Sequence, residues 1–206
     1  MKEDKQGIFF KIYLPLLVTA LICGLILAVT DIFTRENIEQ NREQYTLRYL
    51  HQVFPLDFNN NIYQDRIVVH DPLLSVSDEA VTIYRARQDD TPAGVIVAPV
   101  TTLGYNGRIA LAIGIRYDGS VTGIYTISHH ETKGLGGEIA GEDSHWLNIF
   151  TGISLEGRPA DAWNLTSEGG EFDQISGATI TSRSMVNTVK KTLEFYHGNK
   201  DNLYRE

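Results

Sequence analysis

The hydropathy pattern begins with a long apolar run near the N-terminus. The segment from Ile12 to Thr30 contains 19 residues without a charged side chain and is bounded by Lys11 and Asp31. In a helix that rises about 1.5 Å per residue, such a run just covers a hydrocarbon core of about 30 Å. We therefore predict one transmembrane helix over residues 12–30.

The charges that flank this run predict its orientation. Lys2, Lys5 and Lys11 precede it, whereas only Arg35 follows closely. Because basic residues stay on the cytoplasmic side, residues 1–11 are expected in the cytoplasm and the rest of the chain in the periplasm or its equivalent.

Two other interpretations of the run are open. A cleavable signal peptide shares the basic start and would end near Ala28 to Thr30, although the run exceeds the roughly 7–15 apolar residues usual in such signals. A lipoprotein signal at Cys23 is disfavoured because the bulky Ile22 precedes the cysteine.

A more polar, helix-periodic stretch follows the run. Asp31 to about Val53 carries a thin apolar stripe, and Pro55 closes the pattern. The stripe consists of Ile32, Ile38, Tyr45, Tyr49, Leu50 and Val53. We interpret residues 31–71 as a helical stalk and linker that spaces and docks the following domain, 72–206.

From Ala80 onward the apolar pattern shortens to that of strands. Strands are predicted over 80–87, 93–100, 109–117 and 121–128, with Asp118 and Gly119 giving a strong hairpin signal between the last two. An antiparallel meander of about four strands needs a helix or second layer over one face.

Two helical segments are predicted to pack on this sheet. One is a short piece around 142–150, and the other runs from about Ser182 to His197 with Gly198 as its stop signal. The apolar side of the second consists of Met185, Val189, Leu193 and Tyr196. The expected fold class is α+β, an antiparallel sheet packed with helices and preceded by one transmembrane helix.

Composition narrows the possible functions. The formal charge is −8, and the part after Thr30 has 15 basic and 24 acidic residues, which disfavours binding to a phosphate backbone. Cys23 is the single cysteine, so this chain alone forms no disulfide and no cysteine-ligated cluster. His129, His130 and Glu131 suggest a metal site, but adjacent side chains of a strand point to opposite faces.

The candidate chemistry lies in the stretch from Asp173 to Ser182, just before the predicted C-terminal helix. The start of a helix has unpaired N–H groups and a positive dipole end, and Gly177 and Ala178 let an anion approach the backbone. The hydroxyl groups able to donate to a phosphate there belong to Ser176, Thr179, Thr181 and Ser182. These residues are also typical helix N-caps, and a hydrolase nucleophile is a further interpretation that lacks a G-x-S-x-G elbow.

This stretch resembles the flavinylation motif of a known family. The matching positions are Asp173, Ser176, Gly177, Ala178, Thr179 and Thr181. They resemble the FMN-binding domains of the G subunit of Rnf-type electron transport complexes and of the related C subunit of sodium-translocating NADH:quinone oxidoreductase. In those families a flavin transferase takes FMN from FAD and esterifies its phosphate to the last hydroxyl of the motif. The resemblance implies that Thr181 carries FMN through a phosphodiester bond, that Thr179 is a neighbouring phosphate contact, and that Asp173 serves recognition by the transferase.

A second segment supports the resemblance. Residues 131–136 are similar to the Glu-Thr-Pro-Gly-Leu-Gly loop of the same domains, with Lys133 in place of the proline. By resemblance the loop adds Glu131, Thr132, Leu135 and Gly136 to the cofactor site, the last three bordering the isoalloxazine ring, and Lys133 suggests a looser loop. Gly104 to Gly107 is either a third piece of the pocket or a plain hairpin turn.

The resemblance also implies a function and partners. It implies an electron-carrying subunit of a complex in the bacterial inner membrane that joins ferredoxin and NAD couples to ion movement, with integral membrane and peripheral subunits as partners. The modest length favours the G subunit over the C subunit of the quinone oxidoreductase. A non-redox module that binds an anionic ligand reversibly is the alternative from another class.

Overall fold

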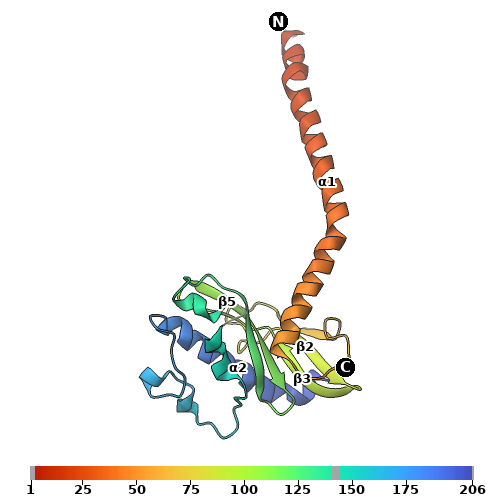
Figure 1. The fold of residues 1–206 in the computed structure, drawn as a ribbon. Coiled ribbons are helices and arrows are strands. Elements are labelled where there is room, and N and C mark those ends of the chain that lie inside the picture. The colour runs from red at the N-terminus through yellow and green to blue at the C-terminus, as the bar shows by residue number, and fades with distance from the viewer. Residues whose placement is uncertain (1–2, 141–143, 206) are drawn as a thin grey trace. The chain divides into compact units, whose positions relative to one another are not determined.

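The computed structural model describes residues 3–140 and 144–205. It divides into two compact units, Met1–Tyr45 and Thr46–Glu206, which are described separately. Helix α1 (Glu3–Val53) contributes to both, because its last turns belong to the second unit (Figure 1). The predicted cytoplasmic residues 1 and 2 lie outside the described residues.

The first unit is the part of α1 up to Tyr45, which contains the apolar stretch. The apolar side chains between Tyr13 and Val29 are exposed, and the helix is long enough and apolar enough to cross a membrane. Pro15 lies inside the helix near the start of this stretch, and its carbonyl accepts a hydrogen bond from the Thr19 hydroxyl.

The second unit is built on a six-stranded antiparallel sheet, so the predicted α+β class with a preceding apolar helix is confirmed. The strands are β1 (Arg66–Val69), β2 (Val81–Gln88), β3 (Thr91–Val97), β4 (Val100–Gly104), β5 (Gly107–Arg116) and β6 (Val121–Ser128). Strands β3 and β4 pair with successive segments of β5, and β6 also pairs with β5. The break between β3 and β4 contains Pro99, which has no N–H to donate.

Helix α2 (Thr179–Leu203) packs on one face of the sheet (Figure 1). Alternate residues of β5, such as Leu111 and Ile113, form a core with Met185 and Val189 of the helix. The helix continues past Gly198, the predicted stop, to Leu203. Its last turn packs on the domain, since Leu203 is 4% exposed and its carbonyl accepts a hydrogen bond from Arg85.

The other face of the sheet is covered by the end of α1 and the segment that follows it. A second core joins this segment to β2, β3 and β5, and it comprises Tyr49, Leu50, Val53, Phe54, Ile62, Tyr84, Ala86, Ile96 and Ala112. Gly114 of β5 permits this contact, because a Cβ there would lie 2.3 Å from the Val53 carbonyl oxygen. The compact unit thus extends well into the range 31–71 that the sequence suggested as stalk and linker.

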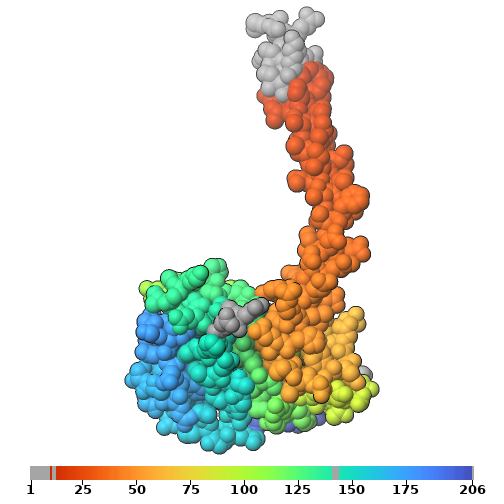
Figure 2. All heavy atoms as spheres, in the orientation of Figure 1, coloured from red at the N-terminus to blue at the C-terminus, as the bar shows by residue number. Residues whose placement is uncertain are grey.

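Loops and short 3-10 helices connect β6 to α2. They include η1 (Gly136–Ile139), η2 (His145–Phe150), η3 (Ala160–Ala162) and η4 (Thr166–Glu168). The predicted helical piece at 142–150 corresponds to η2, while its residues 142 and 143 lie outside the described residues. Figure 2 shows that the teal and light-blue residues of this connection lie beside the green residues of the sheet. The connection closes the core with its residues Phe150, Trp163 and Phe172. The candidate functional site lies where the connection meets α2.

Candidate functional site

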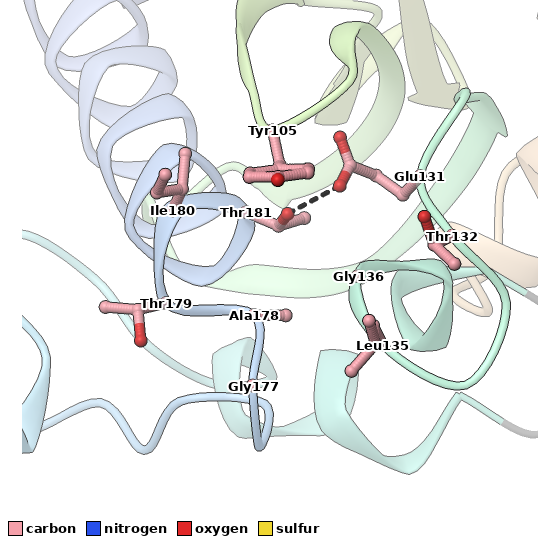
Figure 3. A pocket seen from close by; sticks show the side chains of 10 residues that line it. All are labelled: Tyr105, Glu131, Thr132, Leu135, Gly136, Gly177, Ala178, Thr179, Ile180 and Thr181. Carbon is pink, nitrogen blue, oxygen red and sulfur yellow. Dashed lines mark hydrogen bonds between the residues drawn. The ribbon is translucent and has the colours of Figure 1, made fainter.

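A cavity of about 340 Å³ lies where three segments of the second unit meet (Figure 3). The segments are the β4–β5 turn, the loop after β6, and the stretch that leads into α2. Its lining residues are Tyr105, Glu131, Thr132, Leu135, Gly136, Gly177, Ala178, Thr179, Ile180 and Thr181. The volume falls within the range of roughly 300–1,000 Å³ that is typical of small-molecule sites.

Thr181 lies at the inner side of this cavity in the first turn of α2. Its side chain is 0% exposed to solvent, and its hydroxyl donates a hydrogen bond to Oε2 of Glu131 at 2.6 Å (Figure 3). The other carboxylate oxygen of Glu131 accepts the backbone N–H of Asn106 at 2.9 Å. One carboxylate therefore holds together the Thr181 hydroxyl and the β4–β5 turn.

Two glycines make room for this carboxylate. A Cβ at Gly136 would lie 2.5 Å from Glu131 Oε2 and 2.7 Å from the Thr181 hydroxyl oxygen. A Cβ at Gly104 would lie 2.7 Å from Glu131 Oε1. A side chain at either position would therefore clash with the carboxylate, and one at Gly104 would also lie 2.6 Å from the Gly107 carbonyl oxygen.

The stretch before α2 exposes the start of the helix to the cavity. Gly177 has a φ of +72°, which a side chain would strain, and the N-cap residue Ala178 makes no side-chain cap. The first N–H groups of a helix have no partner within it, and the helix dipole is positive there. The cavity therefore combines a hydroxyl with a helix start suited to a phosphate.

Some of the sequence-predicted site residues do not line the cavity. Ser182 is buried below it, where its hydroxyl donates to the Ala178 carbonyl and accepts the Ile175 N–H, both at 3.0 Å. Ser176 is exposed outside the cavity lining. The other predicted hydroxyl, that of Thr179, lines the cavity and donates to the Gln174 side chain at 3.2 Å.

Asp173, the predicted recognition residue, is also exposed and outside the cavity lining. Its carboxylate accepts a hydrogen bond from the Thr166 hydroxyl at 3.2 Å, and its carbonyl accepts one from the Trp146 indole at 2.8 Å. Its position on the surface leaves it accessible to another protein.

Two cavity residues that neither motif specifies add an apolar surface: Tyr105 belongs to the 104–107 turn that the sequence suggested as a third piece of the pocket, whereas Ile180 was not predicted. Tyr105, at the tip of the β4–β5 turn, is 70% exposed, and Ile180, beside Thr181 in α2, is 47% exposed. Leu135, which the resemblance did predict, is 44% exposed. The sequence signals for Tyr105 and Ile180 were a large apolar side chain next to a glycine turn and another next to Thr181. Neither pattern is specific to a ligand site.

The loop after β6 keeps its turn without the usual proline. The Leu135 N–H donates to the Thr132 carbonyl at 3.1 Å, and Gly134 has a φ of +78°. This combination identifies a type II turn with Lys133 at the position that proline favours. The expectation that lysine loosens the loop concerns its motion and stays a prediction.

The first ionisable residue of α2 is Arg183. Its guanidinium forms an exposed ion pair with Glu168 of η4, and this hydrogen bond lowers the pKa of the Glu168 carboxyl and raises that of the arginine. Among the described residues there is no group of three or more His, Cys, Asp or Glu side chains able to hold a metal ion. His129 instead accepts the Glu131 backbone N–H at 3.1 Å.

Comparison with known proteins matches two parts of the chain. Residues 104–194 match the family described as the FMN-binding domain, and all the cavity residues fall within this range. Residues 14–53 match the family described as the RnfG N-terminal region.

Similar proteins cover nearly the whole chain. The G subunit of the ion-translocating oxidoreductase complex from Shewanella loihica is 36% identical over 185 residues, which cover 89% of this chain and 87% of that protein. The protein of the same name from Pseudoalteromonas atlantica is 35% identical over 201 residues, covering 97% and 91%. That from Vibrio cholerae is 34% identical over 194 residues, covering 94% and 92%. The resemblance predicted from the motif is thereby confirmed, and the chain belongs to the family of G subunits of ion-translocating oxidoreductase complexes.

Proposed function

We propose that this chain carries one FMN, esterified through its phosphate to Thr181, and that it passes electrons within a membrane-bound ion-translocating oxidoreductase complex. The complex couples electron transfer of the ferredoxin and NAD type to ion movement, and a flavin transferase matures this protein. Bound FMN supplies the redox chemistry, while the protein supplies position and electrostatics.

The observation that carries this proposal is the place of the Thr181 hydroxyl. It lies on a cavity at the start of a 25-residue helix, in a domain that matches the FMN-binding family. A phosphate joined to Thr181 would therefore meet the positive end of the α2 dipole, together with the small residues Gly177 and Ala178.

The rest of the cavity suits a flat aromatic ring. Tyr105, Leu135 and Ile180 offer apolar surface, and Gly136 allows close approach to the backbone. We assign the ring contacts to these residues and to Thr132, and the phosphate contacts to Thr179 and Ala178. Ser182 supports the motif loop from outside the cavity through its bonds to Ile175 and Ala178.

The membrane arrangement is part of the proposal. Residues 12–30 anchor the protein in the bacterial inner membrane, residues 1–11 lie in the cytoplasm, and the domain lies in the periplasm. Protease added outside spheroplasts should then digest the domain and leave a short N-terminal fragment in the membrane. A domain that stays intact until the cells are lysed would contradict this orientation.

The attachment is tested by intact mass with and without a co-expressed flavin transferase. We expect an FMN-sized mass increment and a fluorescent band on a denaturing gel, both lost in Thr181→Ala and retained in the matched control Thr151→Ala, an exposed threonine outside the cavity. A reversibly bound flavin would leave the denatured band. An increment that persists in Thr181→Ala, or its absence from wild-type protein beside a competent transferase, would contradict the proposal.

A further inference from the structure

Glu131 is the acid that contacts the proposed acceptor hydroxyl. It is 8% exposed, and its two oxygens accept hydrogen bonds from the Thr181 hydroxyl and the Asn106 N–H. No ion pair between described residues includes it. It is therefore a buried carboxylate with one oxygen directed at the atom that would be esterified.

The surroundings of Glu131 hold it in this position. Gly104 and Gly136 pack against opposite oxygens so closely that no Cβ fits, and the Glu131 N–H donates to His129. On the helix side, Arg183 is the ionisable residue in the first two turns of α2, and it pairs with Glu168 rather than with Glu131. The group best placed to accept the Thr181 proton is thus Glu131.

Building on the proposed function, we propose that Glu131 is the base for attachment of FMN and that it keeps the proton afterwards. The co-reactant is a flavin dinucleotide delivered by the transferase. A bond forms between Thr181 Oγ1 and the phosphorus of the FMN half, and the pyrophosphate P–O bond breaks. The nucleoside monophosphate leaves with the electron pair, and the hydroxyl proton moves to Glu131 Oε2. No atom changes oxidation state.

Retention of the proton follows from charge. The phosphodiester that replaces the hydroxyl carries one negative charge, and an ionised Glu131 would lie against it with no hydrogen between the two oxygens. Like charges this close repel each other, and a hydrogen between the two oxygens removes that repulsion. A protonated Glu131 leaves the site with one negative charge before and after attachment, and its O–H becomes a donor to the new phosphodiester.

The test uses full-length chain, purified without FMN, with purified flavin transferase and FAD, and follows intact mass over time. In Glu131→Gln the amide oxygen still accepts the Asn106 N–H, but the side chain no longer takes a proton. We expect kcat of attachment to fall by about 10²–10⁴-fold with KM for the chain unchanged. Glu138→Gln, an exposed acid in the same loop, is the matched control and should match wild type. Partial recovery of kcat in Glu131→Asp would support the assignment.

Wild-type kcat in Glu131→Gln, or an effect on KM alone, would overturn the role of Glu131 as base. No attachment to wild-type chain would instead defeat the proposed function itself. Retention of the proton is read by ¹³C NMR of glutamate carboxyls in flavinylated wild-type protein. The carboxyl signal that is present in flavinylated wild type and missing from flavinylated Glu131→Gln belongs to Glu131. It should have the chemical shift of a protonated acid, and the chemical shift of an ionised carboxylate would overturn this step.

Discussion

At the scale of single residues, the site depends on a missing side chain beside the Thr181 hydroxyl. The Thr181 hydroxyl and the Glu131 carboxylate meet at 2.6 Å only because Gly136 has no side chain. Gly136 therefore has a steric role toward the Thr181 hydroxyl.

Gly136→Ala tests this role. The new Cβ would lie 2.5 Å from Glu131 Oε2 and 2.7 Å from Thr181 Oγ1. These two atoms must therefore move apart, which lengthens or breaks the hydrogen bond between them. We expect overpacking to cost about 1–3 kcal/mol of unfolding free energy and to slow FMN attachment. Thermal unfolding and intact mass measure the two effects.

The matched control is Gly198→Ala, which lies inside α2 and where the added Cβ meets no atom within 4 Å beyond the adjoining helix backbone. This change should stabilise the protein by about 0.5–1 kcal/mol and leave attachment unchanged. Equal behaviour of the two variants would refute a steric role for Gly136.

The individual residues of the site could be predicted from the sequence better than their contacts. Thr181 and Glu131 were both predicted from local motifs, and both line the cavity. Their hydrogen bond joins residues 50 positions apart, and the fold alone brings them together. Ser182 illustrates the limit, because a hydroxyl beside a motif cannot be separated by pattern from one that closes a loop, as its bonds to Ile175 and Ala178 do.

At the scale of elements, the type II turn after β6 carries an unfavourable residue. Lys133 is at the second position of this turn, where proline fixes the required φ, and no backbone hydrogen bond from its N–H is present among the loop bonds of the described residues. Lys133→Pro should therefore stabilise the protein by about 0.4–1 kcal/mol by restricting the unfolded chain. Chemical denaturation measures the gain. Lys133→Ala removes the charge but leaves the backbone freedom of the unfolded chain, so it should show no such gain. A destabilised Lys133→Pro variant would exclude the turn assignment.

The β5–β6 hairpin gives a prediction about pH. Asp118 accepts hydrogen bonds from the Ser120 hydroxyl at 2.6 Å and the Ser120 N–H at 2.8 Å, and these bonds lower the pKa of its carboxyl. A lowered pKa stabilises the fold above the unfolded value of about 3.9, and that contribution is lost as the pH falls through the folded value. Asp118→Asn should cost less than about 1 kcal/mol at neutral pH, because the group is exposed. The unfolding free energies of wild type and Asp118→Asn should converge as the pH falls into the acid range. A difference in free energy that stays constant with pH would contradict the role of the Asp118 charge.

The elements with the strongest local signals were predicted best. The hairpin at Asp118 and Gly119 and the strands on both sides of it agree with β5 and β6. Strand β1 has only four residues, and β4 follows β3 after a two-residue break, so neither gives a distinct period. Helix α2 runs beyond Gly198 because burial of Leu203 outweighs the local stop signal.

At the scale of the whole molecule, the end of α1 is part of the domain core. The last turns of α1 cover the sheet face opposite α2, which local periodicity could not predict because their apolar stripe is also typical of an exposed stalk. The Thr122 hydroxyl donates to the Val53 carbonyl at 2.5 Å and fixes the end of the helix on β6. A boundary drawn after the helix would therefore cut through the core.

Two soluble fragments distinguish a stalk from a core element. A fragment from Asp31 to the C-terminus keeps all of the second core, whereas one from Leu56 loses Tyr49, Leu50, Val53 and Phe54, each at most 6% exposed. Burial of a large apolar side chain contributes about 1.5–3 kcal/mol, so the loss approaches the total stability of about 5–15 kcal/mol of a typical domain. The shorter fragment should aggregate or lack a cooperative thermal transition.

In the longer fragment, Leu50→Ala should lower the unfolding free energy by about 2–5 kcal/mol, while the exposed Ile38→Ala should change it little. Equal stability of the two fragments would mean that the sheet face does not need the helix, and the end of α1 would then act only as a spacer between membrane and domain.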